Sequence, residues 1–375
     1  RRRRTPPRGP CPRKVGIPVL GHRRHHRGRG RRHDRLRRLA AVAPKEARTL
    51  TRYAGRIVVA LLLAIVLYGA FAAWSDYAQL AASLSDFSWG AFAGACGLAI
   101  GNYVLRFLKW EYYLARLDIR GVPKLDSLLV FLSGFLLSIT PAKVGEVFKS
   151  LLLRSLRDVP VARSAPIVVA ERLTDTIGVT VLVVVGMRGL SVRGAVTGAT
   201  VGAGLVVACL VVIMSRRLSE AVIRGCERLP GPFGRHGPKL RVAWESLREL
   251  TTPAALVVPS LLSVAAWALE GLALWVVVRG FGSTLSVLSS VFFYSTATLA
   301  GAVIPVPGGL GITESALHGQ LQVLGGLTRP VAAGSMILVR FATLWLAVAI
   351  GLIALGVLRW RHPGLHEGVA EETGE

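Results

Sequence analysis

Two short motifs inside apolar sequence place a turn, a glutamate and a distant arginine in the same order. The first reads Pro141-Ala-Lys-Val-Gly-Glu146, and Arg172 follows 26 residues after that glutamate. The second reads Pro307-Gly-Gly-Leu-Gly-Ile-Thr-Glu314, and Arg340 again follows after 26 residues. Each ionisable residue in a membrane segment costs about 2.5–3.5 kcal/mol on insertion scales, so these residues call for a physical reason. Their recurrence indicates a duplicated unit, and duplicated units with interrupted helices are typical of membrane transporters.

The chemistry open to these residues is ion pairing or anion binding. Arg172 and Arg340 could pair with the two glutamates, which would lower the cost of burying both charges. They could instead bind a phosphate, because a guanidinium matches phosphate geometry. A simpler account of Glu146 and Glu314 is that each opens a helix, where the helix dipole stabilises a carboxylate by about 0.3–1 kcal/mol. In that account Thr313 would be the N-cap of the second helix.

More ionisable residues lie close to the first motif. Glu171 and Asp175 stand four residues apart beside Arg172, so in a helix they share one face. They either line a site or form local ion pairs with that arginine. Lys143 and Lys149 flank the first turn. They could attract an anionic headgroup, or they could mark the cytoplasmic side, since cytoplasmic loops are rich in Lys and Arg.

Glu270 is the remaining acidic candidate. It lies in the apolar stretch Trp267-Ala-Leu-Glu270, with no other charge within eight residues. A carboxylate there needs a partner, which must come from another helix, and we expect Glu270 to line the site. Asn102 and Arg106 are weaker candidates, because a long arginine near the end of a span can reach the membrane surface. The turns themselves contain helix-interrupting residues: Pro141, Gly145, Pro307, Gly308, Gly309 and Gly311.

The composition predicts an all-α polytopic membrane protein. Hydrophobic residues make up 52% of the 375 residues, and the mean hydropathy is +0.51. Several apolar stretches approach the roughly 20 residues that span a bilayer. We expect about six to eight transmembrane helices and two re-entrant hairpins, distributed over these segments: 57–74, 91–108, 128–140, 145–157, 166–187, 195–214, 254–278, 286–304, 313–327 and 331–358.

The two hairpins are predicted from segment length and chain direction. Segments 128–140 and 145–157 would each be about 20 Å long, short of the roughly 30 Å hydrocarbon core. A re-entrant hairpin entering from the cytoplasm fits them, because irregular backbone at membrane depth must be buried in protein or line a wet cavity. Three spans follow, and an odd number inverts the next unit. The second hairpin, 286–304 with 313–327, should therefore enter from outside, giving an inverted repeat. Two short spans are the alternative for each hairpin, because they return the chain to the same side, and segment 286–304 is long enough to span.

The charge distribution predicts the orientation. The net charge is +25, and 20 of the 46 Lys and Arg residues lie in residues 1–56. That segment reads as a disordered basic tail without a specific nucleic-acid partner. Loop 75–89 has no Lys or Arg and should face outside. The loop after the second span should face the cytoplasm, because it carries Arg106, Lys109, Arg116, Arg120 and Lys124. We expect both termini in the cytoplasm of a bacterial-type plasma membrane.

This organisation divides the chain into three parts. The membrane domain covers 57–360, with repeat units around 128–187 and 286–358. Within it, residues 215–252 form a basic, amphipathic loop that should lie on the cytoplasmic surface. Residues 361–375 form a short polar tail.

Signatures of soluble catalysis are missing from the sequence. It contains no Gly-Lys-Ser/Thr phosphate loop, no HExxH and no Gly-x-Ser-x-Gly. The four cysteines form no CxxC pair. We therefore expect no cofactor, no metal site and no disulfide.

The motifs together resemble the flippase-like integral membrane family that contains the transmembrane region of lysylphosphatidylglycerol synthase. The resemblance covers roughly residues 57–360. It implies movement of charged or glycosylated lipids between leaflets, with two re-entrant hairpins forming the path. The synthase carries a soluble aminoacyl-transfer domain after its membrane part, whereas 15 residues follow Trp360 here. We therefore do not expect aminoacylation by this chain. Lysines 143 and 149 stand where the family usually shows arginine, which changes the headgroup geometry.

Three functional hypotheses follow. The first is a lipid flippase or scramblase moving anionic, aminoacylated or glycosylated lipids, with membrane lipids as partners and an oligomer or a lipid-synthesis enzyme as a further partner. The second is a membrane-embedded transferase acting on lipid-linked substrates, with Glu171 and Asp175 as its carboxylate pair. The third is a non-transporting scaffold for an envelope-lipid synthesis complex.

Overall fold

The structure is a computed structural model, and every regular element it describes is helical, which confirms the all-α class. It describes residues 77–137, 146–187, 237–303 and 309–363, with a few single positions between 200 and 220. Several predictions fall outside these residues: the tail 1–56, the span 57–74, most of 195–214, the turn residues Pro141, Lys143, Gly145, Pro307 and Gly308, and nearly all of 361–375.

Three of the described helices are long and apolar enough to cross a membrane. They are α3 (Trp89–Arg116), α11 (Pro253–Gly280) and the continuous helix Arg329–Arg361. The continuous helix consists of α14 (Arg329–Arg340), a π-helical turn η6 (Phe341–Trp345) and α15 (Leu346–Arg361). α3 runs on to Arg116 instead of ending at residue 108, so Arg106, Lys109 and Arg116, which we placed in the basic loop, lie on the helix, whereas Arg120 follows it and Lys124 begins the next helix.

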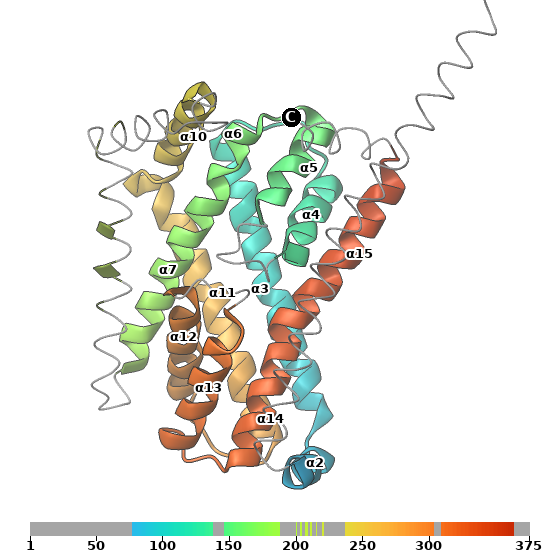
Figure 1. The fold of residues 1–375 in the computed structure, drawn as a ribbon, viewed down its shortest axis with the longest axis vertical. Helices are drawn as coiled ribbons and strands as arrows, with labels where there is room; N and C mark the ends of the chain where they lie inside the picture. The colour runs from blue at the N-terminus through green and yellow to red at the C-terminus, as the bar shows by residue number, and fades with distance from the viewer. Residues whose placement is uncertain are drawn as a thin grey trace, which may run out of the picture. The chain divides into compact units, whose positions relative to one another are not determined.

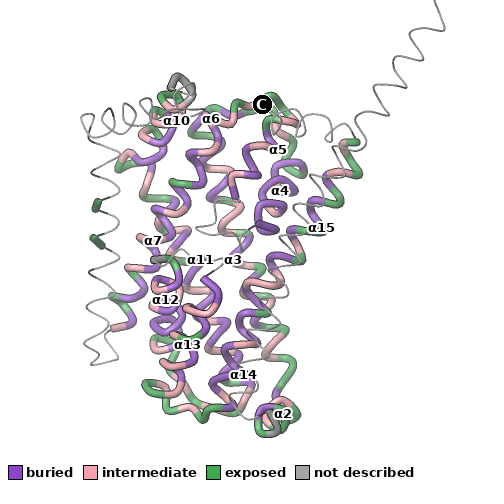
Figure 2. The backbone as a smooth tube through the Cα atoms, viewed as in Figure 1, coloured by how far each residue is buried: buried purple, intermediate pink, exposed green. Residues whose placement is uncertain are grey.

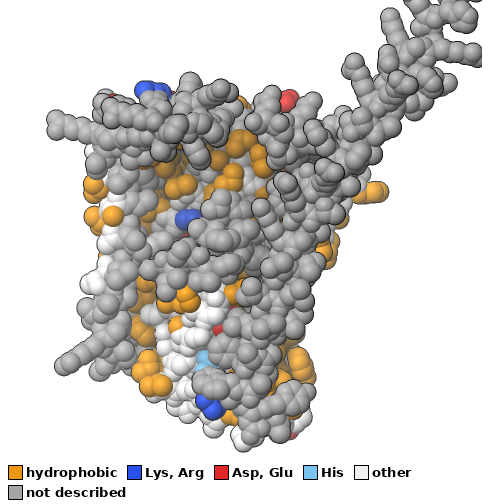
Figure 3. All heavy atoms as spheres, in the orientation of Figure 1, with side chains coloured by type: hydrophobic (Ala, Val, Ile, Leu, Met, Phe, Trp, Pro, Cys, Tyr) orange, Lys and Arg blue, Asp and Glu red, His pale blue; other side chains and the backbone are white. Residues whose placement is uncertain are grey.

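The outward faces of these three helices are apolar. Exposed large hydrophobic side chains follow one another at helical spacing: Ile100, Val104 and Leu108 on α3; Val257, Val258 and Leu261 on α11; Leu352, Ile353 and Val357 on α15. Described side chains on the face shown in Figure 3 are mostly hydrophobic or uncharged, with few charged groups among them. Apolar surface on this scale is what a hydrocarbon environment favours.

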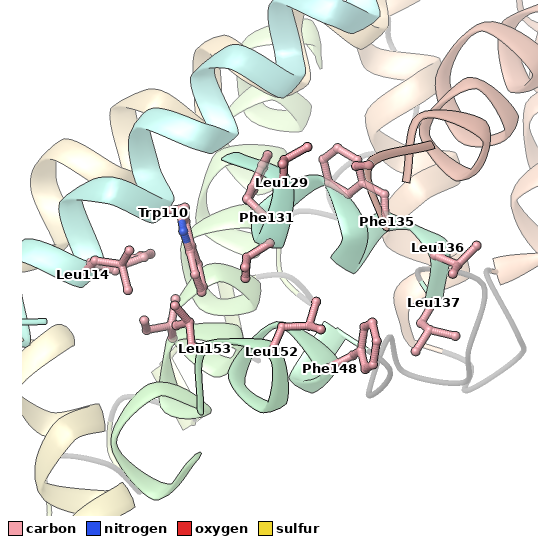
Figure 4. Packing of buried hydrophobic residues seen from close by; sticks show 14 of the residues in the cluster. Trp110, Leu114, Leu129, Phe131, Phe135, Leu136, Leu137, Phe148, Leu152 and Leu153 are labelled. Atoms are coloured by element: carbon pink, nitrogen blue, oxygen red, sulfur yellow. The ribbon is translucent and has the colours of Figure 1, made fainter. Parts of the chain in front are cut away.

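The first hairpin consists of short helices that pack inside the bundle. Its first arm is α4 (Lys124–Ser133) continued by the 3₁₀ turn η1 (Gly134–Leu137), and its second is α5 (Phe148–Arg157). Trp110 of α3 is buried against Phe131 and Leu153 in a cluster that extends toward the turn (Figure 4). Gly351 lets α15 approach η1, because a Cβ there would lie 2.6 Å from the Leu136 nitrogen. The helical prediction is correct over the described residues 128–137, but the helix begins earlier, at Lys124, and changes to 3₁₀ geometry over Gly134–Leu137.

The second hairpin comprises α12 (Val287–Val303) and α13 (Ile312–Val323), packed against each other. α7 (Pro166–Gly186) and α11 both pack on α12. Two glycines make this packing close: a Cβ on Gly271 would lie 2.6 Å from the Val291 Cα, and one on Gly186 would lie 2.7 Å from the Phe292 Cβ. Much of α12, like much of α4, is therefore buried (Figure 2).

The two hairpins lie toward opposite ends of the bundle (Figure 1). α4 and α5 lie at the end that also carries α6 (Val161–Ser164) and α10 (Gly237–Leu250). α13 and α14 lie toward the other end, together with α2 (Tyr77–Ser85), which packs against α14.

α10 is the described part of the predicted amphipathic loop 215–252. Its apolar side chains point inward: Leu247 and Leu250 are buried and Trp244 packs against the core around the first hairpin. Its polar face leaves Arg241 and Glu245 outside this core, as expected of an amphipathic helix. The sequence analysis described this stretch only as an amphipathic loop, and the structure forms a helix over Gly237–Leu250 of it.

Candidate functional site

The structure joins Glu146 and Arg172 in an ion pair, as the spacing of the first motif indicated. An Arg172 Nη atom lies 3.2 Å from Glu146 Oε2 and equally 3.2 Å from Asp175 Oδ2. Glu146 stands just before α5, and Arg172 lies near the start of α7. The Arg172 side chain keeps 27% of its surface exposed, whereas Glu146 keeps 6%. One guanidinium therefore connects the hairpin to α7 while retaining an accessible side.

Asp175 forms ion pairs with three cations from two helices. Lys109 Nζ lies 2.6 Å from Asp175 Oδ1, and an Arg106 Nη atom lies 3.2 Å from Oδ2, in addition to Arg172. Lys109 also donates to the Ser263 hydroxyl of α11 over 2.8 Å. Gly178 allows α7 to come this close to α11, because a Cβ there would lie 2.9 Å from the Ser263 carbonyl carbon.

Two interpretations of these cations were wrong. Lys109 is not a loop charge, because its side chain is 2% exposed inside α3. Arg106 does not reach out to the membrane surface: its guanidinium lies over the Trp267 ring at 5.0 Å and pairs with Asp175. Both errors came from treating charges near the predicted end of a span as markers of the membrane surface.

Lys149 holds the first hairpin to α7 from the other side. Its Nζ lies 2.7 Å from Glu171 Oε2, and both side chains are almost fully buried. The ammonium also lies 4.8 Å from the centre of the Trp110 ring, a geometry in which the ring quadrupole attracts a cation. Gly134 makes room for this side chain, since a Cβ there would lie 2.6 Å from Lys149 Cγ. Glu171 and Asp175 thus have different partners, although they share one helix face.

This first cluster has more cations than carboxylates. Four cations, Arg106, Lys109, Lys149 and Arg172, surround three carboxylates, Glu146, Glu171 and Asp175. The Nε–H groups of Arg106 and Arg172 are buried and find no acceptor among the described residues. A surplus cation and two unused guanidinium donors suit an anionic group with several oxygens.

The second motif also forms a Glu–Arg ion pair, one of the two alternatives that the sequence left open. Arg340 Nε donates to Glu314 Oε1 over 2.7 Å, and the side chains are 8% and 0% exposed. The other carboxylate oxygen accepts the Gly311 N–H at 2.7 Å, so Glu314 itself caps α13. Thr313 is therefore not the N-cap. Gly309 and Gly311 adopt φ values of +67° and +88°, which side chains with a Cβ rarely adopt, and so they shape this turn.

Glu270 takes its partners from other helices, as predicted, but these partners are neutral. Asn102 Nδ2 of α3 donates to Glu270 Oε1 over 2.9 Å, and the Tyr294 hydroxyl of α12 donates to Oε2 over 2.5 Å. Tyr294 also lies 3.1 Å from the Thr343 hydroxyl in the π-helical turn. Among the described residues, no Lys or Arg lies within ion-pair distance of Glu270.

The π-helical turn has its own polar contact. The Tyr103 hydroxyl donates to the Thr343 carbonyl over 2.6 Å, and the Thr343 hydroxyl donates to the Val339 carbonyl over 2.8 Å. Turns of this kind widen the helix and leave carbonyls without a regular partner, and they recur at functional sites. This turn follows Arg340 directly, so the second ion pair lies at the irregular point of the long helix.

Sequence reasoning missed Lys109, Ser263 and Tyr294. A signal was present for the first two, because polar residues recur at helical spacing in otherwise apolar helices. Asn102, Arg106 and Lys109 occupy one face of α3, and Ser263 and Glu270 occupy one face of α11. Tyr294 gave no signal, because an aromatic residue in an apolar segment looks like ordinary core.

The predicted residues thus form separate groups: the first cluster around Asp175, the pair Glu314–Arg340, and Glu270 with its neutral partners. Among the described residues, no ion pair joins one Glu–Arg pair to the other. In the described part of the chain, no three His, Cys, Asp or Glu side chains gather as metal ligands do.

Three helices that are long and apolar enough to cross a membrane, further apolar helices packed against them and ion pairs between helices define a multi-pass helical membrane protein. The chain belongs to the family of the lysylphosphatidylglycerol synthase transmembrane region, whose pattern matches residues 57–351. It is also 23% identical over 309 residues to a protein described as a UPF0104 membrane protein from Methanothermobacter thermautotrophicus (strain Delta H). That alignment covers 78% of this chain and 90% of the matched protein. The family resemblance seen in the motifs is thereby confirmed.

Proposed function

We propose that the protein is a lipid flippase or scramblase that moves anionic, aminoacylated or glycosylated lipids between leaflets of a bacterial-type plasma membrane. The observation that carries this proposal is the pair of buried Glu–Arg ion pairs, one at each of two hairpins on opposite ends of an apolar bundle. Buried charges in a lipid environment are costly, and they mark paths for polar or charged substrates. Membership of the family supports the same class of function.

In this proposal both hairpins are re-entrant, and they enter from opposite faces. The first arm of the first hairpin has 14 residues from Lys124 to Leu137 and would be about 21 Å long as an α-helix, shorter than the roughly 30 Å core. The 17 residues of α12 would extend about 26 Å. The first hairpin opens toward the cytoplasm, where both termini lie, and the second opens toward the outside.

The polar groups have distinct roles in this proposal. Arg106 and Arg172 hold the phosphate of a headgroup, because their Nε–H groups lack acceptors and the cluster has a surplus cation. Glu146 and Glu314 release their arginines as the headgroup arrives, and the acyl chains stay in lipid. Glu270 lines the path between the hairpins, and Lys143 attracts the headgroup at the cytoplasmic entrance.

The test is leaflet translocation of labelled phosphatidylglycerol and lysyl-phosphatidylglycerol in proteoliposomes. We would compare the wild type with Glu146→Gln and with Glu146→Gln/Glu314→Gln, after confirming by size-exclusion chromatography that each variant is folded. Glu111→Gln is a matched control, because this carboxylate pairs with the exposed Lys124 outside both Glu–Arg pairs. The proposal predicts transfer by the wild type and by the control, and loss of transfer in the double variant.

Equal transfer by the wild type and the double variant would clear the two glutamates of a transport role. Transfer by neither protein, with both lipids and with a lipid-linked sugar, would contradict the proposal and favour the scaffold hypothesis.

A further inference from the structure

Two arginines of the first cluster meet at a single oxygen atom of Asp175. An Arg106 Nη atom and an Arg172 Nη atom each lie 3.2 Å from Asp175 Oδ2. The two nitrogens are therefore no farther apart than twice this distance. Two guanidinium groups so close together repel each other unless a negative charge lies between them. Asp175 supplies that charge and so keeps both groups in one place.

The Asp175 carboxylate is itself held by two other helices. Its second oxygen, Oδ1, accepts a hydrogen bond from Lys109 Nζ of α3 over 2.6 Å and another from the Ser263 hydroxyl of α11 over 3.1 Å. The side chain is buried, so water competes little for these contacts. Oδ1 thus anchors the carboxylate, and Oδ2 faces the two arginines.

Each of the two guanidinium groups keeps an unused donor after these contacts. The Nε–H groups of Arg106 and Arg172 are buried and have no acceptor among the described residues. The Arg106 guanidinium also lies over the Trp267 ring at 5.0 Å, a contact that attracts and orients it. The Arg172 side chain is 27% exposed, so a ligand can reach it. A phosphate oxygen accepts such N–H groups more strongly than a neutral oxygen does.

Glu171 provides an internal comparison, because it carries the same charge and stands one turn earlier on the same face of α7. Its ion-pair partner is Lys149, whose Nζ lies 2.7 Å away. Among the ion pairs of the described residues, neither Arg106 nor Arg172 lies within pairing distance of Glu171. Removal of either carboxylate raises the charge of the cluster equally, but only removal of Asp175 releases the arginines.

We propose that Asp175 is a positioning residue of the headgroup site: it holds the guanidinium groups of Arg106 and Arg172 together so that their free Nε–H groups donate to one phosphate group. The inference rests on the proposed function and deepens it, because it assigns the ligand chemistry and the residue that prepares the site for it. When the phosphate arrives, Arg172 leaves Glu146 while Asp175 retains it. This role gives a reason for a carboxylate within an anion-binding site, where its charge alone would weaken the binding.

The test is a calorimetric titration of the purified full chain in a maltoside detergent, once with dihexanoyl-phosphatidylglycerol and once with inorganic phosphate. Charge and positioning predict opposite results for Asp175→Asn. If charge alone decides, loss of a carboxylate tightens anion binding. If positioning decides, binding weakens by about tenfold to a hundredfold, the range expected for loss of one charge-assisted hydrogen bond. The matched control Glu171→Gln should bind the lipid as tightly as the wild type or more tightly.

Two further variants separate positioning from a general loss of structure. Asp175→Glu keeps the charge and moves the carboxylate by one methylene group, so it should also weaken binding. Arg106→Lys keeps the charge and removes the Nε–H group. It should weaken binding in the wild type and have little further effect in Asp175→Asn, because Arg106 is no longer held in place there.

An Asp175→Asn variant that binds the lipid as tightly as the wild type, or more tightly, would overturn the proposal. So would independent effects of Arg106→Lys and Asp175→Asn that simply multiply. If Asp175→Asn does not fold, unchanged binding by Asp175→Glu would overturn it instead.

The two probes identify the source of the phosphate. Binding of the lipid alone would support a lipid headgroup as the ligand, and binding of inorganic phosphate, alone or as well, would support a site for phosphate groups in general. Binding of neither probe by the wild type would overturn the proposal. Lipid binding without translocation in proteoliposomes would remove the proposed function and leave this inference standing, so the two failures are distinguishable.

Discussion

The two Glu–Arg pairs match in sequence but should differ in their contribution to stability. Replacing Glu314 by Gln removes the carboxylate next to Arg340, whose side chain is only 8% exposed. Breaking a buried pair in this way costs about 3–5 kcal/mol. Replacing Glu146 by Gln should cost only about 1 kcal/mol or less, because Arg172 is partly exposed and keeps Asp175 at 3.2 Å.

The assay is unfolding in mixed micelles with increasing dodecyl sulfate, followed by tryptophan fluorescence. A double-mutant cycle with Arg340→Met isolates the pair, because removal of both charges leaves no unpaired ion. Glu314→Gln/Arg340→Met should therefore be more stable than Glu314→Gln alone. Equal losses in Glu314→Gln and Glu146→Gln would refute this reasoning, and so would a double variant in which the two losses simply add.

Other predictions concern packing, charge and topology. Gly271→Ala should destabilise the protein by about 1–3 kcal/mol because its Cβ would overlap Val291, whereas Gly97→Ala, with no atom within 4 Å, should be neutral or slightly stabilising; thermal unfolding compares the two. Lys149→Met should lower the free energy of unfolding by about 3–5 kcal/mol, because it leaves Glu171 buried without its cation. The control Lys124→Met removes an 81% exposed partner of Glu111 and should cost at most about 1 kcal/mol in the same measurement. Cysteines placed at Asp118 and Asp158 should react with an impermeant maleimide only from the cytoplasmic side. Cysteines placed at Ser85 and Thr284 should react only from the outside. Labelling of all four from one side would contradict the predicted orientation.

The sequence predicted the helical class and the span 254–278 almost to its ends, and it offered Glu–Arg pairing as one of two interpretations, beside phosphate binding. These features could be inferred because each depends on a local stretch of sequence or on a motif that occurs twice. An apolar stretch of sufficient length forms a helix in lipid, since its backbone groups must be satisfied internally. The spacing of 26 residues from Glu to Arg occurs twice in the sequence. This repetition indicates that each Glu and the Arg after it act together, which a single occurrence would not indicate.

The parts that the sequence did not reveal depend on how helices pack. Lys109 looked like a surface marker, because nothing local shows that α3 continues past it and buries it against Asp175. The contact of Tyr294 with Glu270 requires the register between α11 and α12 to be known. Nothing in the sequence indicates that Lys149 occupies the space where a Cβ on Gly134 would lie.

The π-helical turn Phe341–Trp345 also sets the rotational phase between the two ends of the protein. α14 packs against α13 of the second hairpin, and α15 packs against α4 and η1 of the first. A regular α-helix turns by about 100° per residue, and a π turn accommodates one additional residue. Deleting that residue would rotate α15 by about 100° relative to α14 and turn Gly351 away from η1. The one additional residue therefore lets α14 face the second hairpin and α15 face the first hairpin within a single continuous helix.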